Sequence, residues 1–340
     1  MLHRKSTRTV SLRFALFVLP LFVLFVFSLA ACGGSPGSGS TATVPTSHSL
    51  TSRNATTTPV ANSNPNSNLL AVLPLLHKSL QAMQQVKSFH VAIQGKGMIQ
   101  TSGDFLPKLA MGIPYSLRAT ADIDIAHRQG QAYAHLKLLP PQAAALSLKA
   151  TARLLDHWLY LREPNCQWFS LDLVSTLAFL KAQAMGQLPQ PQNLLTLIGD
   201  VTVTDHGITT LDGKQARHLT LSINQHALSQ IMDTVRQQQV KEALASIQAP
   251  EGISVDLFID NATFLLVRAQ VKGGFSVNVD ELLKATGQTT PSTPVGNRAR
   301  MLTVSFALTV TLSKFHQQIP NVVSPHQARP IDLMLLIASL

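Results

Sequence analysis

The chain has 340 residues, 45% of them hydrophobic and only 13% charged, whereas about a quarter charged is usual for soluble proteins. This apolar content allows a sizeable core, and the length fits two domains or one large β-rich domain. A formal net charge of +10 favours anionic partners, and the presence of only two cysteines excludes a disulfide-rich scaffold.

The N-terminal segment has the parts of a secretory signal. An apolar run from Phe14 to Ala31 follows a basic head, and no acidic residue occurs before Asp104. Leu29-Ala30-Ala31-Cys32 resembles a bacterial lipobox, which directs a diacylglyceryl group onto the cysteine sulfur and cleavage before it. We therefore expect a signal peptide over residues 1–31 and lipidation of Cys32. An uncleaved transmembrane anchor is the alternative. The basic head consists of Arg4, Lys5, Arg8 and Arg13.

Residues 32–68 are predicted to be a tether, because Gly, Ser, Thr, Asn and Pro dominate and few apolar side chains are present. Four of the 27 basic residues leave with the signal, so 23 basic and 17 acidic residues remain, a net charge of +6. Outside the cell this charge suits anionic lipid headgroups or wall polymers better than nucleic acid. A generically basic surface is the alternative.

The first predicted element after the tether is a helix over residues 69–87. Its apolar residues recur at steps of three and four, which places Leu73, Leu76, Leu80 and Met83 on one face. Pro74 fits this helix if it lies in the first turn. From Ser88 onward the apolar residues alternate with polar ones, which is typical of strands. The predicted strands are 88–94, 119–125, 131–138, 146–154, 158–161 and 167–171.

The second half of the chain mixes helices with strands. Helical spacing returns over 172–187 and again over 225–248. The strands predicted here are 201–204, 216–223, 253–259, 264–271, 275–279 and 300–312. Since each strand has one apolar face, we expect an antiparallel sheet covered on one side by the helices.

No catalytic motif is present. The sequence lacks a His-Glu-x-x-His motif, a phosphate-binding loop and a dinucleotide-binding glycine pattern. Its 12 histidines are scattered singly, so we expect no metal site, no cofactor and no enzymatic activity. Asp122 and Asp124 share the polar face of one strand and are expected to be solvated. Cys166, beside Trp168 and Phe169, is expected near the core, without a disulfide partner if Cys32 is lipidated.

The order of parts resembles a known family. Val86-Lys-Ser-Phe-His90, Trp158-Leu-Tyr160, Leu194-Leu195, Asp212-Gly213 and Ser313-Lys-Phe315 follow the lipobox and the tether. This arrangement resembles the LppX/LprG-type bacterial lipoproteins, whose fold is similar to that of LolA and LolB. The resemblance implies an α+β fold, with a curved antiparallel β-sheet (a half-barrel) wrapped around several helices. The domain would cover 69–328, followed by an apolar tail over 329–340; this tail and the segment 140–155 depart from the family.

The resemblance also implies a function. Such a lipoprotein is anchored by its lipid at the extracytoplasmic face of the cell membrane and binds or carries lipid acyl chains in an apolar cavity between sheet and helices. A lipid or lipoglycan is the expected ligand, a membrane transporter is a candidate partner, and no nucleic acid is expected. A non-catalytic sensor or adaptor of the same fold, binding a protein or cell-wall partner, is the alternative. The candidate cavity residues are Leu76, Leu80, Leu173, Leu177, Leu180, Leu228, Ile231 and Val235.

Overall fold

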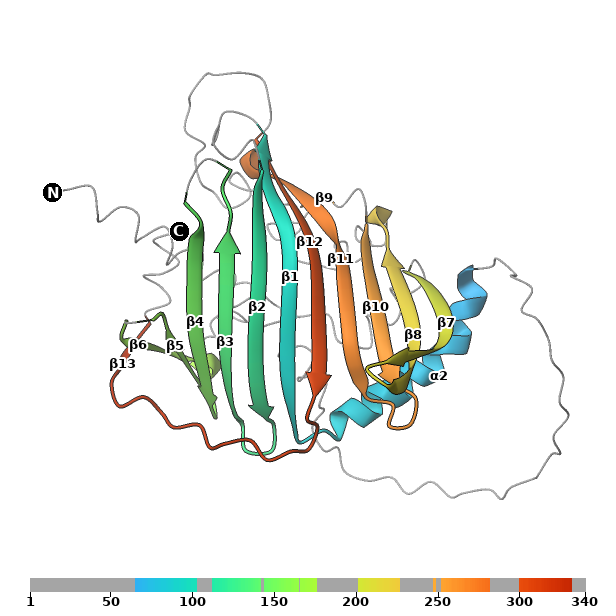
Figure 1. The fold of residues 1–340 in the computed structure, drawn as a ribbon, viewed down its shortest axis with the longest axis horizontal. Helices are drawn as coiled ribbons and strands as arrows, with labels where there is room; N and C mark the ends of the chain where they lie inside the picture. Colours follow the sequence, from blue (N-terminus) through green and yellow to red (C-terminus); the bar gives the residue numbers. More distant parts are fainter. Residues whose placement is uncertain are drawn as a thin grey trace, which may run out of the picture.

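The described part of the chain forms one curved sheet of 13 strands with a long helix at one end (Figure 1). A computed structural model describes residues 65–102, 112–141, 144–164, 166–175, 201–226, 247–248, 252–281 and 300–331. The strand order is β13-β6-β5-β4-β3-β2-β1-β12-β11-β10-β8-β7, and β9 pairs with β11. The predicted α+β class with a curved antiparallel sheet is confirmed.

In chain order, the elements of the first half are α2 (Pro65–Gln84), β1 (Ser88–Ser102), β2 (Ile113–Asp124), β3 (Gln129–Leu138), β4 (Leu146–Leu155), β5 (Trp158–Arg162) and β6 (Trp168–Asp172). The second half contributes β7 (Val201–Leu211), β8 (Lys214–Ile223), β9 (Ile247–Gln248), β10 (Ile253–Asp260), β11 (Leu266–Asn278), β12 (Met301–Ser313) and β13 (Ala328–Pro330). Neighbouring strands are antiparallel throughout, except that β13 runs parallel to β6.

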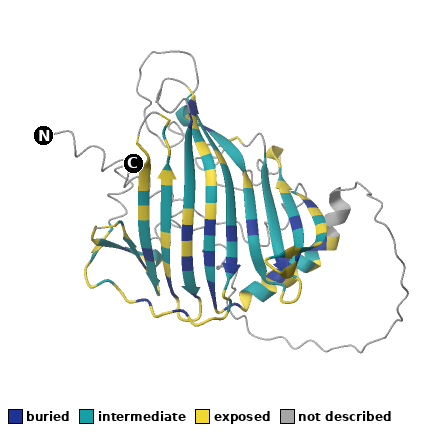
Figure 2. Cartoon of the chain, in the orientation of Figure 1, coloured by how far each residue is buried: buried dark blue, intermediate teal, exposed yellow. Residues whose placement is uncertain are grey.

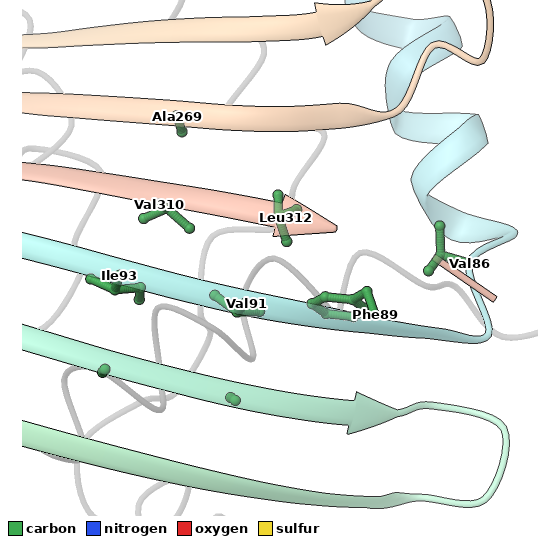
Figure 3. Packing of buried hydrophobic residues seen from close by; sticks show 9 residues of the cluster. Val86, Phe89, Val91, Ile93, Ala269, Val310 and Leu312 are labelled. Atoms are coloured by element: carbon green, nitrogen blue, oxygen red, sulfur yellow. The ribbon is translucent and has the colours of Figure 1, made fainter. Parts of the chain in front are cut away.

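The centre of the sheet is the pair β1–β12, whose register runs from His90 opposite Ser313 to Ser102 opposite Met301. Alternate residues of β1 are buried, as the period-two pattern predicts. We call the face that carries these buried residues the inner face, and the opposite face the outer face. The core of the inner face joins Val86, Phe89, Val91, Ile93, Ala269, Val310 and Leu312 with Ala119 and Ala121 (Figure 3).

The helix α2 packs on the β7 end of the inner face. Val72 is 2% exposed and forms a second buried cluster with Val203, Leu219 and Ile259. The helix begins at Pro65, so Pro74 lies inside it rather than in its first turn. Pro74 cannot donate a backbone hydrogen bond, but its exposed position keeps its ring out of the packed side. The predicted tether therefore overlaps the first turn of α2.

Three local expectations are wrong. The two strands expected over 264–271 and 275–279 are one strand, β11, because Gly273 and Gly274 stay in the ladder with β12. Cys166 is exposed rather than close to the core, since it lies in the β5–β6 connection. Asp124 is buried rather than solvated: its carboxylate accepts hydrogen bonds from the backbone N–H of His127 at 3.1 Å and from the side chain of Gln129 at 3.4 Å.

The predicted helices after β6 and β8 are visible only at their first residues. Residues 173–175, 225–226 and 279–281 are helical, and the residues that follow each of these turns lie outside the described ranges. Asp172 caps the first of these, because its carboxylate accepts hydrogen bonds from the backbone of Val174 at 3.0 Å and the hydroxyl of Ser175 at 2.6 Å.

After β12 the chain runs along the lower strand ends to β13, and we call residues 314–327 the strap (Figure 1). Ser88 donates its hydroxyl hydrogen bond to the carbonyl of Gln317 at 2.6 Å. Further along, the backbone N–H of Val322 donates to the side-chain oxygen of Gln129 at 3.0 Å. The strap therefore ties the sheet centre to its β6 edge. The predicted tail beyond residue 331 lies outside the described residues.

Candidate functional site

The inner face carries a continuous apolar surface beside the buried core. One cross-strand row runs over nine strands, from β4 to β7, and contains only aliphatic residues and one glycine. At ~4.8 Å per strand the row spans about 38 Å along the curved sheet. Its members are Leu148, Leu136, Leu117, Gly95, Leu308, Val271, Val255, Leu221 and Val203.

The next row is apolar apart from the Tyr115 hydroxyl and contains close approaches at its glycines. Its members are Leu146, Leu138, Tyr115, Gly97, Phe306, Gly273, Ile253, Ile223 and Val201. Phe306 lies between Gly97 of β1 and Gly273 of β11. A Cβ at Gly97 would lie 2.7 Å from the ring of Tyr115, so the glycine makes room for this ring over β1. The Tyr115 hydroxyl donates to the carbonyl oxygen of Ser305 at 3.3 Å, and burial raises the pKa of Tyr115 above its ordinary value.

Burial decreases along the inner face from the core to these two rows (Figure 2). Val91 and Ile93 are 2% and 4% exposed, whereas Leu136 and Leu148 are half-buried. Leu146, at the end of β4, is 43% exposed although its register places it on the inner face. Apart from Val203, which is buried beneath α2, the two rows, which we call the inner apolar surface, are therefore not sealed as the core is.

The predicted cavity residues are placed only in part. Leu76 packs against the cluster of Val72, Val203, Leu219 and Ile259, and Leu173 is half-buried at the start of its helix. Leu80 is 42% exposed, because the buried side of α2 passes through Val72, Ser79 and Met83 instead. The remaining five candidates, Leu177, Leu180, Leu228, Ile231 and Val235, lie outside the described residues.

Sequence reasoning placed its candidate cavity residues on helices and named none on the strands that carry the inner apolar surface. The alternation of Leu136 and Leu138, or of Leu146 and Leu148, marks these residues as one face of a strand. The sequence therefore did contain a signal that these leucines share one face of the sheet. What alternation cannot give is the register that aligns these leucines with Leu308 and Val255 from distant segments.

Polar groups on the described inner face concentrate near the β7 edge. The guanidinium of Arg217 donates from Nε to both carboxylate oxygens of Asp205, at 3.2 and 3.0 Å, and Nη2 forms a further contact. These hydrogen bonds, helped by the backbone N–H of Gly207, outweigh burial and hold the pKa of Asp205 below its ordinary value. Because Arg217 and Asp205 bind each other, their arrangement gives no indication of a ligand at this edge.

Neither a metal centre nor a membrane-crossing helix is found in the described ranges. Across these residues, no three His, Cys, Asp or Glu side chains are arranged to hold a metal ion. Within the same ranges, no helix combines the length and apolar character needed to cross a bilayer.

The described residues thus define an α+β domain with an open, curved antiparallel sheet and an apolar inner face.

No protein-family model matches the chain, and no curated protein matches it significantly. Similar solved structures include the lipoprotein LppX from Mycobacterium tuberculosis, with 16% identity, 75% of this chain and 99% of LppX covered, and a TM-score of 0.36. LprF from Mycobacterium bovis shares 15% identity, with 74% and 97% covered and a TM-score of 0.34. A putative outer membrane lipoprotein-sorting protein domain from Vibrio parahaemolyticus shares 8% identity, with 76% and 96% covered and a TM-score of 0.18. The family that the sequence resembles is also represented among these structures.

Proposed function

We propose that the protein is a membrane-tethered, exported lipoprotein that binds lipid acyl chains on its inner apolar surface. The observation that carries this proposal is the row of aliphatic side chains across nine strands, half-buried along much of its length. An acyl chain spans half of the ~30 Å hydrocarbon core of a bilayer, so the ~38 Å row is long enough for two chains end to end.

The mechanism is partition of acyl chains from water onto an aliphatic surface. Each methylene removed from water contributes about 0.8 kcal/mol, and a surface of Leu and Val side chains provides contact without a competing polar group. The Gly95 and Gly97 positions on β1 allow side chains from both neighbouring strands to lean inward over the sheet. Specificity for a headgroup would come from residues outside this surface.

The test compares two tryptophan substitutions on adjacent residues of β10. Val255 belongs to the inner apolar surface, and Ser254 lies on the outer face of the same strand. Val255→Trp should lower the amount of lipid that co-purifies with the full chain several-fold, as measured by mass spectrometry of an organic extract. Ser254→Trp is the matched control and should retain the lipid of the parent protein.

An unfolding measurement on the same variants separates the acyl-binding function from the alternative. If acyl chains occupy the space in front of Val255, the added ring takes their place and stability changes little. A packed core would instead be overpacked and lose about 1–3 kcal/mol. Such a loss, together with a parent protein that carries no lipid, would contradict the proposal and favour the sensor or adaptor.

A further inference from the structure

Five basic side chains gather on the outer face of the sheet, on β1 to β4. Arg118 of β2 lies opposite His135 of β3, and His135 lies opposite Lys149 of β4. Lys96 of β1 and Lys137 of β3 lie on either side of a single β2 residue. They belong to the cross-strand row next to that of Arg118, His135 and Lys149. The lysines and the arginine are exposed, and His135 is half-buried. We call these five residues the outer basic patch.

The outer basic patch is electrostatically unfavourable within the protein itself. Arg118 and Lys149 lie on either side of His135 on three adjacent strands, so positive charges crowd one face of the sheet, which is destabilising. Burial and then the charges of Lys149, Lys137 and Arg118 lower the pKa of His135. None of the described acidic residues forms an ion pair with the patch; Asp122 of β2 is bound to His90 at 2.7 Å instead. The repulsion indicates an anionic partner outside the chain.

Three large apolar side chains flank these cations. Met98, Tyr133 and Leu139 are 37%, 43% and 46% exposed. Met98 and Tyr133 are each two residues from a member of the outer basic patch on the same strand, and therefore lie on the same side of the sheet. Leu139 follows the end of β3, two residues after Lys137. A soluble polyanion would neutralise the cations but leave these three side chains in water. The interface of an anionic bilayer accommodates both kinds of side chain.

We propose that the outer basic patch docks the domain onto anionic lipid headgroups, with Met98, Tyr133 and Leu139 entering the membrane interface. The predicted anchor at Cys32 supports this partner, because it would hold the domain close to a bilayer. The inner apolar surface then faces away from that bilayer, since it lies on the opposite side of the same strands. The proposal does not depend on acyl-chain binding by the inner surface.

The test measures lysine acetylation of the full chain reconstituted in vesicles. Vesicles of phosphatidylcholine alone are compared with vesicles that also contain phosphatidylglycerol, and modification is followed by mass spectrometry. In the anionic vesicles, Lys96, Lys137 and Lys149 should react at least about threefold more slowly, and high salt should abolish this protection. Lys78, exposed on α2 at the inner face, and Lys214, at the β7–β8 turn, serve as internal controls and should react equally in both vesicles.

A charge-reversal variant tests the role of the patch directly. Lys137→Glu with Lys149→Glu should restore the acetylation of Lys96 in anionic vesicles, since each basic residue near such a surface changes binding about fivefold. The matched variant Lys78→Glu with Lys214→Glu should leave the protection intact.

Equal acetylation of Lys96 in the two vesicle types would overturn the proposal. So would equal protection when dextran sulfate is added to phosphatidylcholine vesicles, because the partner would then be an anionic polymer. Lipid co-purification by the inner surface is measured separately, so either proposal can fail alone.

Discussion

Alanine in place of Gly97 should destabilise the protein far more than alanine in place of Gly95. Both glycines lie on the inner face of β1, two residues apart. A Cβ at Gly97 would lie 2.0 Å from the carbonyl oxygen of Ser305 and 2.7 Å from the Tyr115 ring. A Cβ at Gly95 would lie 2.3 Å from the end of the Leu308 side chain, which can rotate away.

The expected magnitudes depend on which atoms have to move. Displacing a backbone carbonyl of the central strand β12 belongs at the upper end of the overpacking range, about 3 kcal/mol. Alanine recovers about 0.5–1 kcal/mol because it loses less conformational freedom on folding than glycine. The net cost of Gly97→Ala is therefore about 2 kcal/mol, or a fall of about 4–8 °C in Tm for a domain of this size. Gly95→Ala should change stability by less than about 1 kcal/mol.

The assay is guanidinium denaturation of the parent and both variants, with thermal unfolding as a second measurement. Equal losses for the two variants, or a loss below about 1 kcal/mol for Gly97→Ala, would refute the close approach of β1 and β12 at Ser305. Gly97→Ala should also move the Tyr115 ring, so its near-ultraviolet signal should change, while the spectrum of Gly95→Ala should match that of the parent.

Two further predictions concern charge and lipidation. Asp205 has a lowered pKa in the folded protein, so its stabilising contribution is present above its unfolded pKa of about 3.9 and is lost as the pH falls through its lower folded value. Asp205→Asn should cost about 1 kcal/mol of stability at pH 7, a figure reduced by the partial exposure of Arg217. It should also flatten the acid limb of a stability–pH curve measured with urea. An unchanged acid limb would contradict the stabilising role of the Asp205–Arg217 pair. Cys32→Ser should abolish incorporation of labelled fatty acid in bacteria, and unchanged labelling would contradict the lipobox.

Local patterns predicted the strands well because burial on one face imposes a period of two. The alternation in 131–138 and 146–154 matches β3 and β4 almost to the residue. Glycine was the misleading signal. Gly273 and Gly274 indicate a break in the sequence, yet both stay in register with β12, since a close backbone approach favours glycine as strongly as a turn does.

The sites depend on register, which the sequence does not contain. Arg118, His135 and Lys149 lie on separate strands, and nothing in the spacing between them shows that they become neighbours. The same holds for the inner apolar surface, where Leu136 and Leu308 belong to opposite halves of the chain. A related limit applies to Leu80: two overlapping apolar stripes fit α2, and packing against Val203 buries the stripe through Val72 and leaves Leu80 42% exposed.

The central pair β1–β12 has a consequence for the time at which the sheet can be completed. His90 and Ser313 are about 220 positions apart, so this pairing is among the slowest kinds of contact to form. Strands β2 to β6 and β7 to β11 can assemble from near neighbours, but the two halves join only when the last described strands have been made. For the exported lipoprotein proposed above, a sheet that cannot be completed during synthesis would keep the chain unfolded, as passage across a membrane in an extended state requires.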